Sequence, residues 1–529
     1  MQITYLTLLP PILVLIAAFI TKKIKTSLFL GIFSAALISN NYGIKDTLTS
    51  IFSRFYDQFK DIDNYYFFSL IFILGIIIAL ITKTGGAQAL GDIIIKKAKS
   101  RKDAETSTLL LSTCLFIDDY LNSLTVGYVM RPLTAKFNIP RVKLAYLIGV
   151  MAGSLVVIMP ISSWVGMLIG QLSLSGISLD PAAKPIILAD SFFVYLKSIP
   201  FIFYSFIMIA STWFIVRRRI SYGPMHQFEK IAKETGNLFG GKFVKEEILE
   251  STKTTHSILD FFLPILILIF SVIIGIPYVG GYYLFGGTNT LIQSFQYSNA
   301  SLVLCIASAL SLIISLIFAL IRKKIKIFDT VTITKNGIEM MFASVVTIIF
   351  AWVFGSFLKQ DLKTGIYLAD LLLGIVNIHI LPLMIYLTSI IIALAIGSSW
   401  GTIAILVPIV VPMVLTFLNI PTPTLFENVI LLLPCIGAIF SGSITGNHLS
   451  PISDSTIMAS TSTGAHIIDL VKARFYYVIP SVIATSISFL IIGFLINKNI
   501  YLALTSSILA GILISFGLLL FMQKIFRRS

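Results

Sequence analysis

Apolar residues occupy most of the chain in long runs that are separated by short polar stretches. A helix needs about 20 apolar residues to cross a bilayer, so the pattern predicts a helical membrane protein with many spans. The runs typical of single spans, one of them short, lie near 4–21, 27–39, 65–81, 191–216, 258–276, 300–321, 338–357, 475–496 and 500–522. Amphipathic pieces at 43–63 and 362–377 and a hydrophilic loop at 217–256 lie between them.

Four further apolar segments are interrupted by polar residues near their middle. Each half of the chain contains two of them in the same order, at 105–136 and 142–176, and again at 380–418 and 427–468. Paired interrupted segments in corresponding positions are the strongest sequence indication of a transporter's binding site. The interruptions are Asp118-Asp119-Tyr120-Leu121-Asn122, Met159-Pro160-Ile161-Ser162-Ser163-Trp164, Gly397-Ser398-Ser399-Trp400-Gly401-Thr402 and the stretch from Gly442 to Asp454.

The two halves also match residue by residue. Aligning Asp118 with Ser398 places Pro132 on Pro412. In the segments that follow, Pro160-Ile161-Ser162 lines up with Pro451-Ile452-Ser453. We therefore interpret the chain as two repeats, each with a pair of interrupted elements.

Composition excludes the soluble and disordered classes. Of the 529 residues, 57% are hydrophobic and 12% are charged, and the mean hydropathy is +0.94. Soluble domains carry about 25% charged residues, and disordered chains have far fewer apolar ones. The net charge of +15 is explained by the excess of Lys and Arg on cytoplasmic loops, so no nucleic-acid partner is expected.

Basic residues decide how the first interrupted segment is arranged. They flank it on both sides, at 96–102 and at 131–143. Both flanks lie in the cytoplasm only if 105–136 is a re-entrant hairpin. Continuing along the chain, this arrangement places the N-terminus outside and the C-terminus inside, together with the basic groups at 217–219, 322–324, 472–474 and 524–528. The second hairpin, 380–418, then enters from outside, so the two halves have inverted topology.

The predicted fold is an all-α polytopic membrane protein with about 11 transmembrane helices, two re-entrant hairpins and discontinuous helices in an inverted-topology repeat. N-terminal spans and an amphipathic segment occupy 1–64. The first repeat is expected at 65–216, the loop and linking spans at 217–335, the second repeat at 336–496 and a C-terminal span at 497–529.

The interruptions carry the candidate chemistry. An Asp near the centre of a membrane helix costs about 2.5–3.5 kcal/mol on insertion, so Asp118, Asp119 and Asp454 are predicted to bind Na⁺ and protons in competition. Hard oxygen ligands suit such an ion, and unwound backbone at this depth must line a cavity or be buried. The remaining candidate ligands are Asn122, Ser162, Ser398, Ser399, Thr402, Asn447, His448 and Ser453.

Simpler roles stay open for several of these residues. One of Asp118 and Asp119 is expected to cap the helix over 120–134 while the other faces the site, and the sequence does not assign them. Capping by Asp454 is the less favoured interpretation. His448 is balanced between a structural and a proton-sensitive role. The three cysteines form no disulfide or metal motif, and no cofactor is expected beyond the transported ions.

The motifs resemble those of the NhaC-type sodium/proton antiporters, a family of the ion transporter superfamily. The resemblance covers roughly 65–495 and implies inverted repeats with paired hairpins, Na⁺ or Li⁺ export in exchange for H⁺, a bacterial cytoplasmic membrane, and a homodimer with elevator-like movement. The matching residues run from Phe116 to Gly127 with Met130-Arg131-Pro132, from Met159 to Trp164, from Gly397 to Thr402 and from His448 to Thr456.

Two departures from the family pattern leave a second function open. Gly149 stands where the family often carries an Asp, and Asn447 replaces the usual Asp before the last motif. With two carboxylates missing, either the stoichiometry is lower or the substrate is not a simple cation. The alternative is therefore a Na⁺- or H⁺-coupled exchanger of a small carboxylate, of the malate/lactate type found in the family. A membrane-embedded hydrolase or a channel is disfavoured, because neither needs a duplicated midplane site.

Overall fold

The computed structural model describes residues 5–21, 23–60, 62–181, 184–242, 257–372, 376–496 and 498–526. The first half contains helices α1 (Leu9–Thr21), α2 (Ile24–Ser39), α3 (Ile44–Gln58), α4 (Ile62–Thr84), α5 (Gly86–Lys97), α6 (Arg101–Cys114), α7 (Asp119–Lys136), α8 (Arg141–Val156), α9 (Val165–Leu174), α10 (Ser191–Ser198), α11 (Phe203–Arg218) and α12 (Gly223–Thr235).

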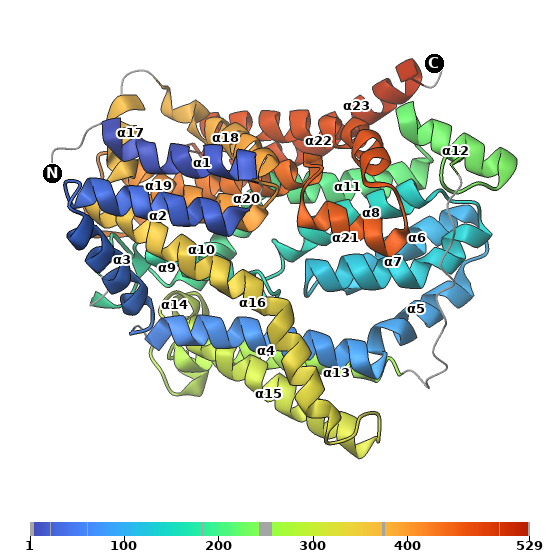
Figure 1. Cartoon of the computed structure of the whole chain (residues 1–529), viewed down its shortest axis with the longest axis horizontal. Coiled ribbons are helices and arrows are strands. Elements are labelled where there is room, and N and C mark those ends of the chain that lie inside the picture. The colour runs from blue at the N-terminus through green and yellow to red at the C-terminus, as the bar shows by residue number, and fades with distance from the viewer. Residues whose placement is uncertain are drawn as a thin grey trace.

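The second half is helical to the same degree, and Figure 1 shows how its elements pack against the first. Its helices are α13 (Leu259–Val279), α14 (Leu291–Gln296), α15 (Ala300–Ile321), α16 (Asp329–Ser356), α17 (Thr364–Leu372), α18 (Leu381–Ile396), α19 (Ser399–Phe417), α20 (Leu432–Leu449), α21 (Asp454–Thr463), α22 (Ile467–Leu495) and α23 (Ile500–Phe526).

The predicted all-α polytopic fold is confirmed. Among the described residues, eight helices are long and apolar enough to cross a membrane, and a bent pair, Ser191–Phe201 with Phe203–Thr235, makes up to nine. The count is not directly comparable with the number expected: the first two expected spans are short helices of 13 and 16 residues, and the eight include α18 and α19, which the sequence predicts as one hairpin. The segments 142–176 and 427–468 are each divided into two shorter helices, α8 with α9 and α20 with α21.

The first interrupted segment folds as a hairpin with both ends at one face of the molecule. Near the start of α6, Glu105 Oε1 lies 2.9 Å from Lys143 Nζ at the start of α8, and only four residues separate the end of α7 from the start of α8. The tip, 115–118, lies in the interior. We call the end of the molecule that contains Arg101, Lys143 and Arg217–Arg219 the basic face; it is at the right of Figure 1.

The second interrupted segment starts and ends at the opposite face. α18 begins beside the end of α22, where His379 Nδ1 lies 2.7 Å from the Gly493 carbonyl oxygen. α19 leads into a strand at the same end of the molecule. The two hairpins therefore enter the protein from opposite faces, which is the geometry of an inverted repeat. The domain limits drawn from the sequence remain predictions.

Three strands of two residues each join the halves at this opposite face. They are β1 (Ile177–Ser178), β2 (Ile187–Leu188) and β3 (Thr424–Leu425), in the spatial order β1-β2-β3. Both pairs are parallel. β1 follows α9 and β3 follows α19, so the sheet ties an end of the first repeat to an end of the second.

Helices α4 and α16 cross so closely that only glycine fits at the crossing. A Cβ on Gly75 would lie 2.5 Å from the Gly337 carbonyl oxygen, and one on Gly337 would lie 2.5 Å from Ile76 Cα. Small residues let membrane helices approach in this way. α13 and α15 lie beside α4 along the lower edge of Figure 1, and we refer to these four helices as the scaffold layer.

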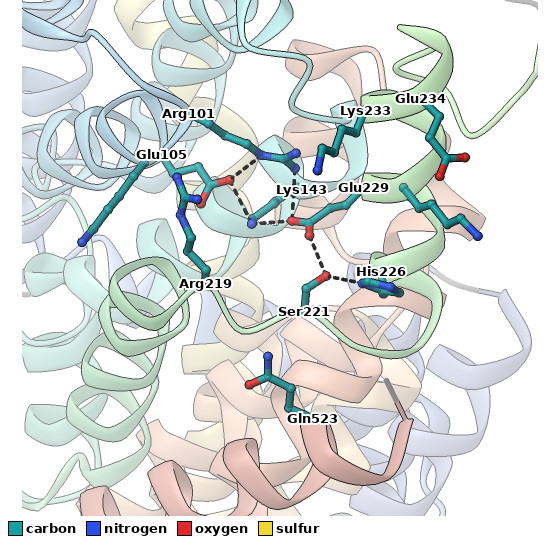
Figure 2. Close-up of a pocket in the computed structure, with 12 residues that line it drawn as sticks. Arg101, Glu105, Lys143, Arg219, Ser221, His226, Glu229, Lys233, Glu234 and Gln523 are labelled. Carbon is teal, nitrogen blue, oxygen red and sulfur yellow. Dashed lines mark hydrogen bonds and ion pairs between the residues drawn. The ribbon is translucent and has the colours of Figure 1, made fainter. Parts of the chain in front are cut away.

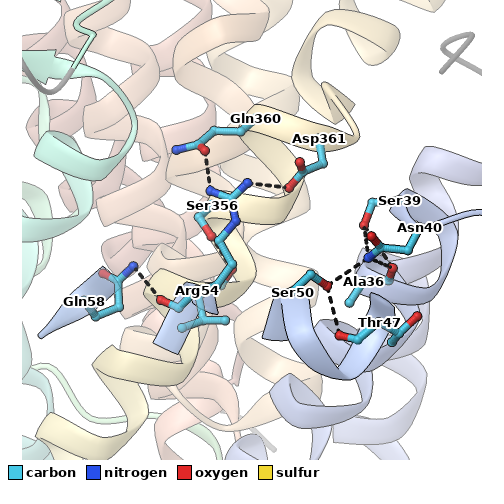
Figure 3. A network of polar contacts seen from close by, with 11 residues as sticks. Ala36, Ser39, Asn40, Thr47, Ser50, Arg54, Gln58, Ser356, Gln360 and Asp361 are labelled. Atoms are coloured by element: carbon cyan, nitrogen blue, oxygen red, sulfur yellow. Dashed lines mark hydrogen bonds and ion pairs between the residues drawn. The ribbon is translucent and has the colours of Figure 1, made fainter. Parts of the chain in front are cut away.

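The amphipathic segment at 43–63 contains helix α3, which polar contacts fasten to its neighbours (Figure 3). Arg54 Nη2 lies 2.9 Å from Asp361 Oδ2, just after α16, and Arg54 also bonds Gln360. Asn40 Nδ2 donates to Ser50 Oγ at 2.8 Å. α3 is thereby held against α2 and the end of α16. In the expected loop at 217–256, α12 forms a further helix, and residues 243–256 lie outside the described part of the chain.

Candidate functional site

The four interruptions meet inside the protein. Ser163, in the break between α8 and α9, donates its hydroxyl to Asp118 Oδ2 at the tip of the first hairpin, at 2.7 Å. The next residue of that break, Trp164, packs edge-on against Trp400 at the tip of the second hairpin, with ring centroids 5.8 Å apart. One break is thus joined to both hairpin tips.

The break between α20 and α21 completes the circuit. A Cβ on Gly397, at the second tip, would lie 3.0 Å from the Ile452 carbonyl oxygen. Tyr120 of the first tip donates its hydroxyl to Asp454 Oδ2 at 3.3 Å. The four interruptions therefore form a closed ring of contacts that alternates between hairpin tips and helix breaks.

Asp118 is the residue that caps helix α7. Its Oδ1 accepts from the Leu121 backbone N–H at 2.8 Å, and the side chain is 1% exposed. Ser398 holds the equivalent position in α19, where its hydroxyl accepts from the Gly401 backbone N–H at 3.2 Å. The sequence alignment of Asp118 with Ser398 thus corresponds to the same cap in both repeats.

Asp119 and Asp454 begin half-helices without capping them. Asp119 Oδ1 accepts from Trp164 Nε1 at 3.1 Å, and Asp454 follows the cap of α21, which is Ser453. The N-terminus of a helix favours negative charge, so each carboxylate lies where its ionised form is stabilised. Both oxygens of Asp118, in contrast, are already bonded.

Several other predicted ligands satisfy the backbone in this conformation. The Asn122 amide closes the first hairpin by donating to the Ser112 carbonyl at 2.7 Å and accepting from the Ser112 hydroxyl at 2.6 Å. Hydroxyls donate to carbonyl oxygens at 2.7–3.0 Å from the side chains of Ser162, Ser399 and Thr402. In these contacts, side chains supply the hydrogen bonds that backbone carbonyl oxygens at the interruptions would otherwise lack.

Asn447 and His448 lie in the last turn of helix α20. Asn447 Oδ1 accepts from Ser455 Oγ. His448 is 1% exposed, and its Nδ1 lies 2.9 Å from Tyr204 Oη. The contact with Tyr204 gives His448 the hydrogen bond that a structural role requires. Asn447 bonds to Ser455, across the break between α20 and α21.

Arg474 was expected among the cytoplasmic charges, and that prediction is wrong. The side chain is 0% exposed and donates to Thr456 Oγ1 of α21. Helix positions two apart face different directions, so Lys472 is exposed while Arg474 points inward. Lys472 and Arg474 together indicated a cytoplasmic loop. Only their spacing along a helix could have indicated that Arg474 points into the protein.

Tyr120 and Asp454 both line two cavities. The sequence predicted Asp454 as a site residue but not Tyr120. The larger has a volume of about 620 Å³ and lies between the scaffold layer and the first hairpin, with Tyr128, Met340 and Met458 in its walls. The smaller, of about 180 Å³, adjoins Ser398 and Trp400. In the part of the chain that the structure describes, Asp454 is the one ionisable acid lining the larger cavity.

The three acids do not gather into one metal-type cluster. Among the described residues, no three His, Cys, Asp or Glu side chains lie close enough together to hold a metal ion. Asp118 bonds Ser163, Asp119 bonds Trp164, and Asp454 bonds Tyr120. The predicted sharing of Na⁺ among all three acids stays a prediction.

A third cavity, of about 460 Å³, lies at the basic face and contains an ion-pair network (Figure 2). Lys143 bonds both Glu105 and Glu229, and Arg101 Nη2 lies 3.3 Å from Glu229 Oε1. Ser221 donates to Glu229 Oε2 at 2.6 Å. The network connects α12 with α6 of the first hairpin and with α8.

Charge keeps Glu229 ionised in this network. Burial by itself would raise the pKa of Glu229, but the neighbouring Lys143 and Arg101 outweigh burial and hold the pKa below its usual range. At neutral pH, α12 is therefore fastened to the hairpin by full charges.

The chain is similar in sequence to known membrane transporters. A family model described as the Na⁺/H⁺ antiporter family matches residues 155–494. A protein of Haemophilus influenzae described as uncharacterized is 28% identical over 494 residues, covering 92% of this chain and 91% of its own. The malate-2H(+)/Na(+)-lactate antiporter of Bacillus subtilis is 31% identical over 168 residues, covering 31% of this chain and 32% of its own.

Two solved transporter structures align with most of the chain, at low similarity. The YdaH transporter of Alcanivorax borkumensis has 14% sequence identity and a TM-score of 0.49, covering 86% of this chain and 89% of its own. MtrF of Neisseria gonorrhoeae, described with a class of antimetabolite efflux pumps, has 15% identity and a TM-score of 0.43, covering 89% and 84%. Identification rests on the family match instead of on these structures.

The family match extends over well over half of the chain. It begins at the end of α8 and includes the second hairpin and the break that carries Asp454. The resemblance noted from the sequence motifs is confirmed. The chain is a polytopic membrane transporter that belongs to the Na⁺/H⁺ antiporter family.

Proposed function

We propose that the protein exchanges Na⁺ or Li⁺ for H⁺ by alternating access, with Asp454 as the principal site and Asp119 beside it. The observation that carries this proposal is the contact between Tyr120 and Asp454, because two cavities share that pair. A carboxylate at the meeting point of two cavities is placed to receive an ion from one and release it to the other.

Competition between two cations on one carboxylate drives the exchange. The ionised Asp454, stabilised by the N-terminus of α21, offers hard oxygen to Na⁺. A proton on the same carboxylate removes the charge that holds Na⁺ and so releases the metal. Because only one of the two occupies the site at a time, inward proton movement is coupled to outward Na⁺ movement.

The basic face is the side that we place in the cytoplasm. It carries Arg217–Arg219, Lys143 and Lys242, and cytoplasmic loops are enriched in such residues. The N-terminus is then outside and the C-terminus inside, and Figure 1 shows the start of α1 and the end of α23 at opposite ends of the molecule. We expect a bacterial cytoplasmic membrane and a homodimer, as the family resemblance implies.

Proton flux in everted membrane vesicles tests the proposal. Adding Na⁺ or Li⁺ to respiring vesicles should dissipate the pH gradient, and Asp454→Asn should lose this response. Asp469→Asn is the matched control, because Asp469 is an acid at the basic face paired with Lys242. An Asp454→Asn protein as active as the wild type would overturn the assignment of the site.

A second candidate is exchange of a small carboxylate coupled to Na⁺ or H⁺. Buried Arg474 supports it with a positive charge that a cation carrier does not need, and the named Bacillus subtilis relative acts on malate and lactate. Against it, the described residues that line the larger cavity include an acid and no base. Vesicles that respond to malate or lactate but to neither Na⁺ nor Li⁺ alone would establish this candidate in place of the first.

A further inference from the structure

The cavity at the basic face carries more positive charge than its own acids neutralise. Its volume of about 460 Å³ lies in the range of roughly 300–1,000 Å³ that is typical of small-molecule sites. A cleft lined by an excess of one charge concentrates ions of the opposite sign. Among the described residues, three glutamates line this cavity together with six basic side chains, which are Arg101, Lys102, Lys143, Arg219, Lys230 and Lys233.

Two of the three glutamates are already neutralised inside the cavity. Glu105 and Glu229 pair with Arg101 and Lys143, so two acids balance two bases. The third glutamate, Glu234, is exposed. In the described part of the chain, the other four basic side chains of the lining have no ion pair with a carboxylate. Their charge is left for solvent or for a ligand.

The bases without ion pairs come from three different elements. Arg219 ends α11 in the left-handed backbone conformation, with a φ of 54°, which glycine adopts at lower cost than arginine. Its side chain points toward the ion-pair network, as does that of Lys233 on α12 (Figure 2). Lys102 belongs to α6 of the first hairpin. Bases from α6, α11 and α12 therefore line one cavity.

We propose that this cavity binds a phosphate group, supplied by a phospholipid headgroup or by a soluble phosphate. A phosphate presents several strong acceptor oxygens, so bases on different elements can share it, and arginine can bind two of its oxygens at once. A carboxylate has fewer oxygens and a single charge, which suits fewer bases. Basic pockets at the cytoplasmic ends of membrane helices bind lipid headgroups for the same reason. The proposal does not depend on which ion the transporter exchanges.

A bound phosphate would fasten the first hairpin at the basic face. Lys102 lies on that hairpin, whereas Arg219 and Lys233 lie outside it. A group held by all three would add to the ion pair that Glu229 of α12 already makes with Arg101 of α6. Binding at this site is therefore expected to stabilise the folded protein.

Thermal unfolding of the purified full-length protein in a neutral detergent tests the proposal without measuring transport. Potassium phosphate or pyrophosphate is added at millimolar concentration, with potassium chloride keeping the ionic strength constant. The unfolding midpoint should rise by about 1–3 °C and saturate, as for a ligand that binds only the folded state. In a second arm, short-chain phosphatidylglycerol replaces the soluble salts. Phosphatidylcholine, whose cationic choline the basic cavity disfavours, is its control.

Matched variants separate the site from general effects, because phosphate also stabilises proteins by exclusion from their surface. Arg219→Gln with Lys233→Gln removes two lining bases that have no ion pair, and should lose the saturable rise. Arg217→Gln with Arg218→Gln removes the same charge from exposed positions just before Arg219. The described lining includes neither of them, so this variant should keep the rise. Both variants leave the pairs of Glu229 intact.

Three results would overturn the proposal: no rise with any of the phosphate compounds, an equal rise in Arg219→Gln with Lys233→Gln, or an equal rise with malate at the same ionic strength. A rise with phosphatidylglycerol alone assigns the group to a lipid, and a rise with the salts assigns it to a soluble ligand. Asp454→Asn should retain the response, so a failure of this site and a failure of the proposed exchange are told apart.

Discussion

At the scale of single residues, the site depends on which acid uses its oxygens for the backbone. Asp118 gives one oxygen to the Leu121 N–H and the other to Ser163. Asp119 and Asp454 each accept from one aromatic side chain, Trp164 or Tyr120. Asp118 and Asp119 therefore differ because Asp118 caps the helix, and this capping residue is buried with both oxygens bonded.

Separating the charge of Asp118 from its capping bond gives the first prediction. Asp118→Asn keeps an oxygen that can accept from Leu121, so the unfolding midpoint should change little while exchange falls. Asp118→Ala should in addition lose about 1 kcal/mol of stability. Ser398→Ala removes the equivalent cap without removing a charge, and should cost similar stability. Full exchange in Asp118→Asn would show that the charge is dispensable.

Removing the Tyr120 hydroxyl gives the second prediction. Tyr120→Phe takes away the donor that holds Asp454 Oδ2, and a lost hydrogen bond of about 0.5–1.5 kcal/mol should raise the half-saturating Na⁺ concentration several-fold at fixed pH. Tyr128→Phe is the control, because Tyr128 lines the same cavity from α7. Equal Na⁺ dependence in the two variants would contradict a role for the Tyr120 contact.

Residue roles could be predicted from sequence only in part. The motif around Asp118 and Asp119 indicated one capping and one free acid, because Asp is a good cap and is costly in a membrane. Whether Asp118 or Asp119 is the cap depends on the residue at which α7 starts, which the motif does not show. Arg474 was misplaced because a charge near a span end has the same sequence signal whether it faces water or the interior.

At the scale of elements, helix α12 fastens the first hairpin at the basic face. Glu229 pairs with Arg101 of α6 and Lys143 of α8, so a movement of the hairpin must break or carry these bonds. The charges were counted in the sequence as topological markers. Their pairing across three elements depends on the tertiary fold and could not be predicted from spacing.

Neutralising Glu229 gives the third prediction. Glu229→Gln should lower the unfolding free energy at pH 7 by about 1–2 kcal/mol, while Glu234→Gln, in the same cavity but exposed, should not. The folded pKa of Glu229 lies below its unfolded value of about 4.3. The stabilisation is therefore complete above that value and is lost as the pH falls through the folded pKa.

Unfolding midpoints of the two proteins measured from pH 7 down to pH 3 check this prediction. The difference between wild type and Glu229→Gln should stay constant at neutral pH and shrink only in strong acid. A difference that disappears already near pH 6 would mean that another group carries the effect.

At the scale of the whole molecule, the membrane-spanning helices differ in how much of their apolar stretch is buried. The most apolar stretch of α19 is 83% buried, against 39% for α13, 33% for α15 and 22% for α23. The ring of hairpin tips and breaks lies in the buried part, and the larger cavity separates it from the scaffold layer. From the position of this cavity we predict that the first hairpin moves against the scaffold layer.

Cross-linking across the larger cavity gives the fourth prediction. Met340 of α16 and Met458 of α21 both line it, so Met340→Cys with Met458→Cys, in a background without the three native cysteines, should be bridged by a bifunctional thiol reagent. Exchange should stop on bridging and return on reduction. Each single cysteine with the same reagent is the control. Undiminished exchange in the bridged protein would exclude this movement.

The overall topology was the feature that the sequence predicted best. Hydropathy and basic flanks predicted the helical class, the four interruptions and the opposite entry of the hairpins, because these follow from water and lipid. Helix α1 was expected as a full span and α2 as a short one. How far a short apolar run reaches is decided by packing against its neighbours, which the sequence does not display. The small sheet β1-β2-β3 gave no periodic signal at two residues per strand.

Asp118 and Ser398 cap equivalent helices in the two repeats. The caps have the same geometry, but only Asp118 can carry a negative charge. Exchanging the two side chains would leave both helix starts capped and would carry one carboxylate across the pseudo-twofold axis to the hairpin of the opposite leaflet. At this pair of positions the hydrogen bond that caps the helix is present in both repeats, while the charge is present in the first repeat alone.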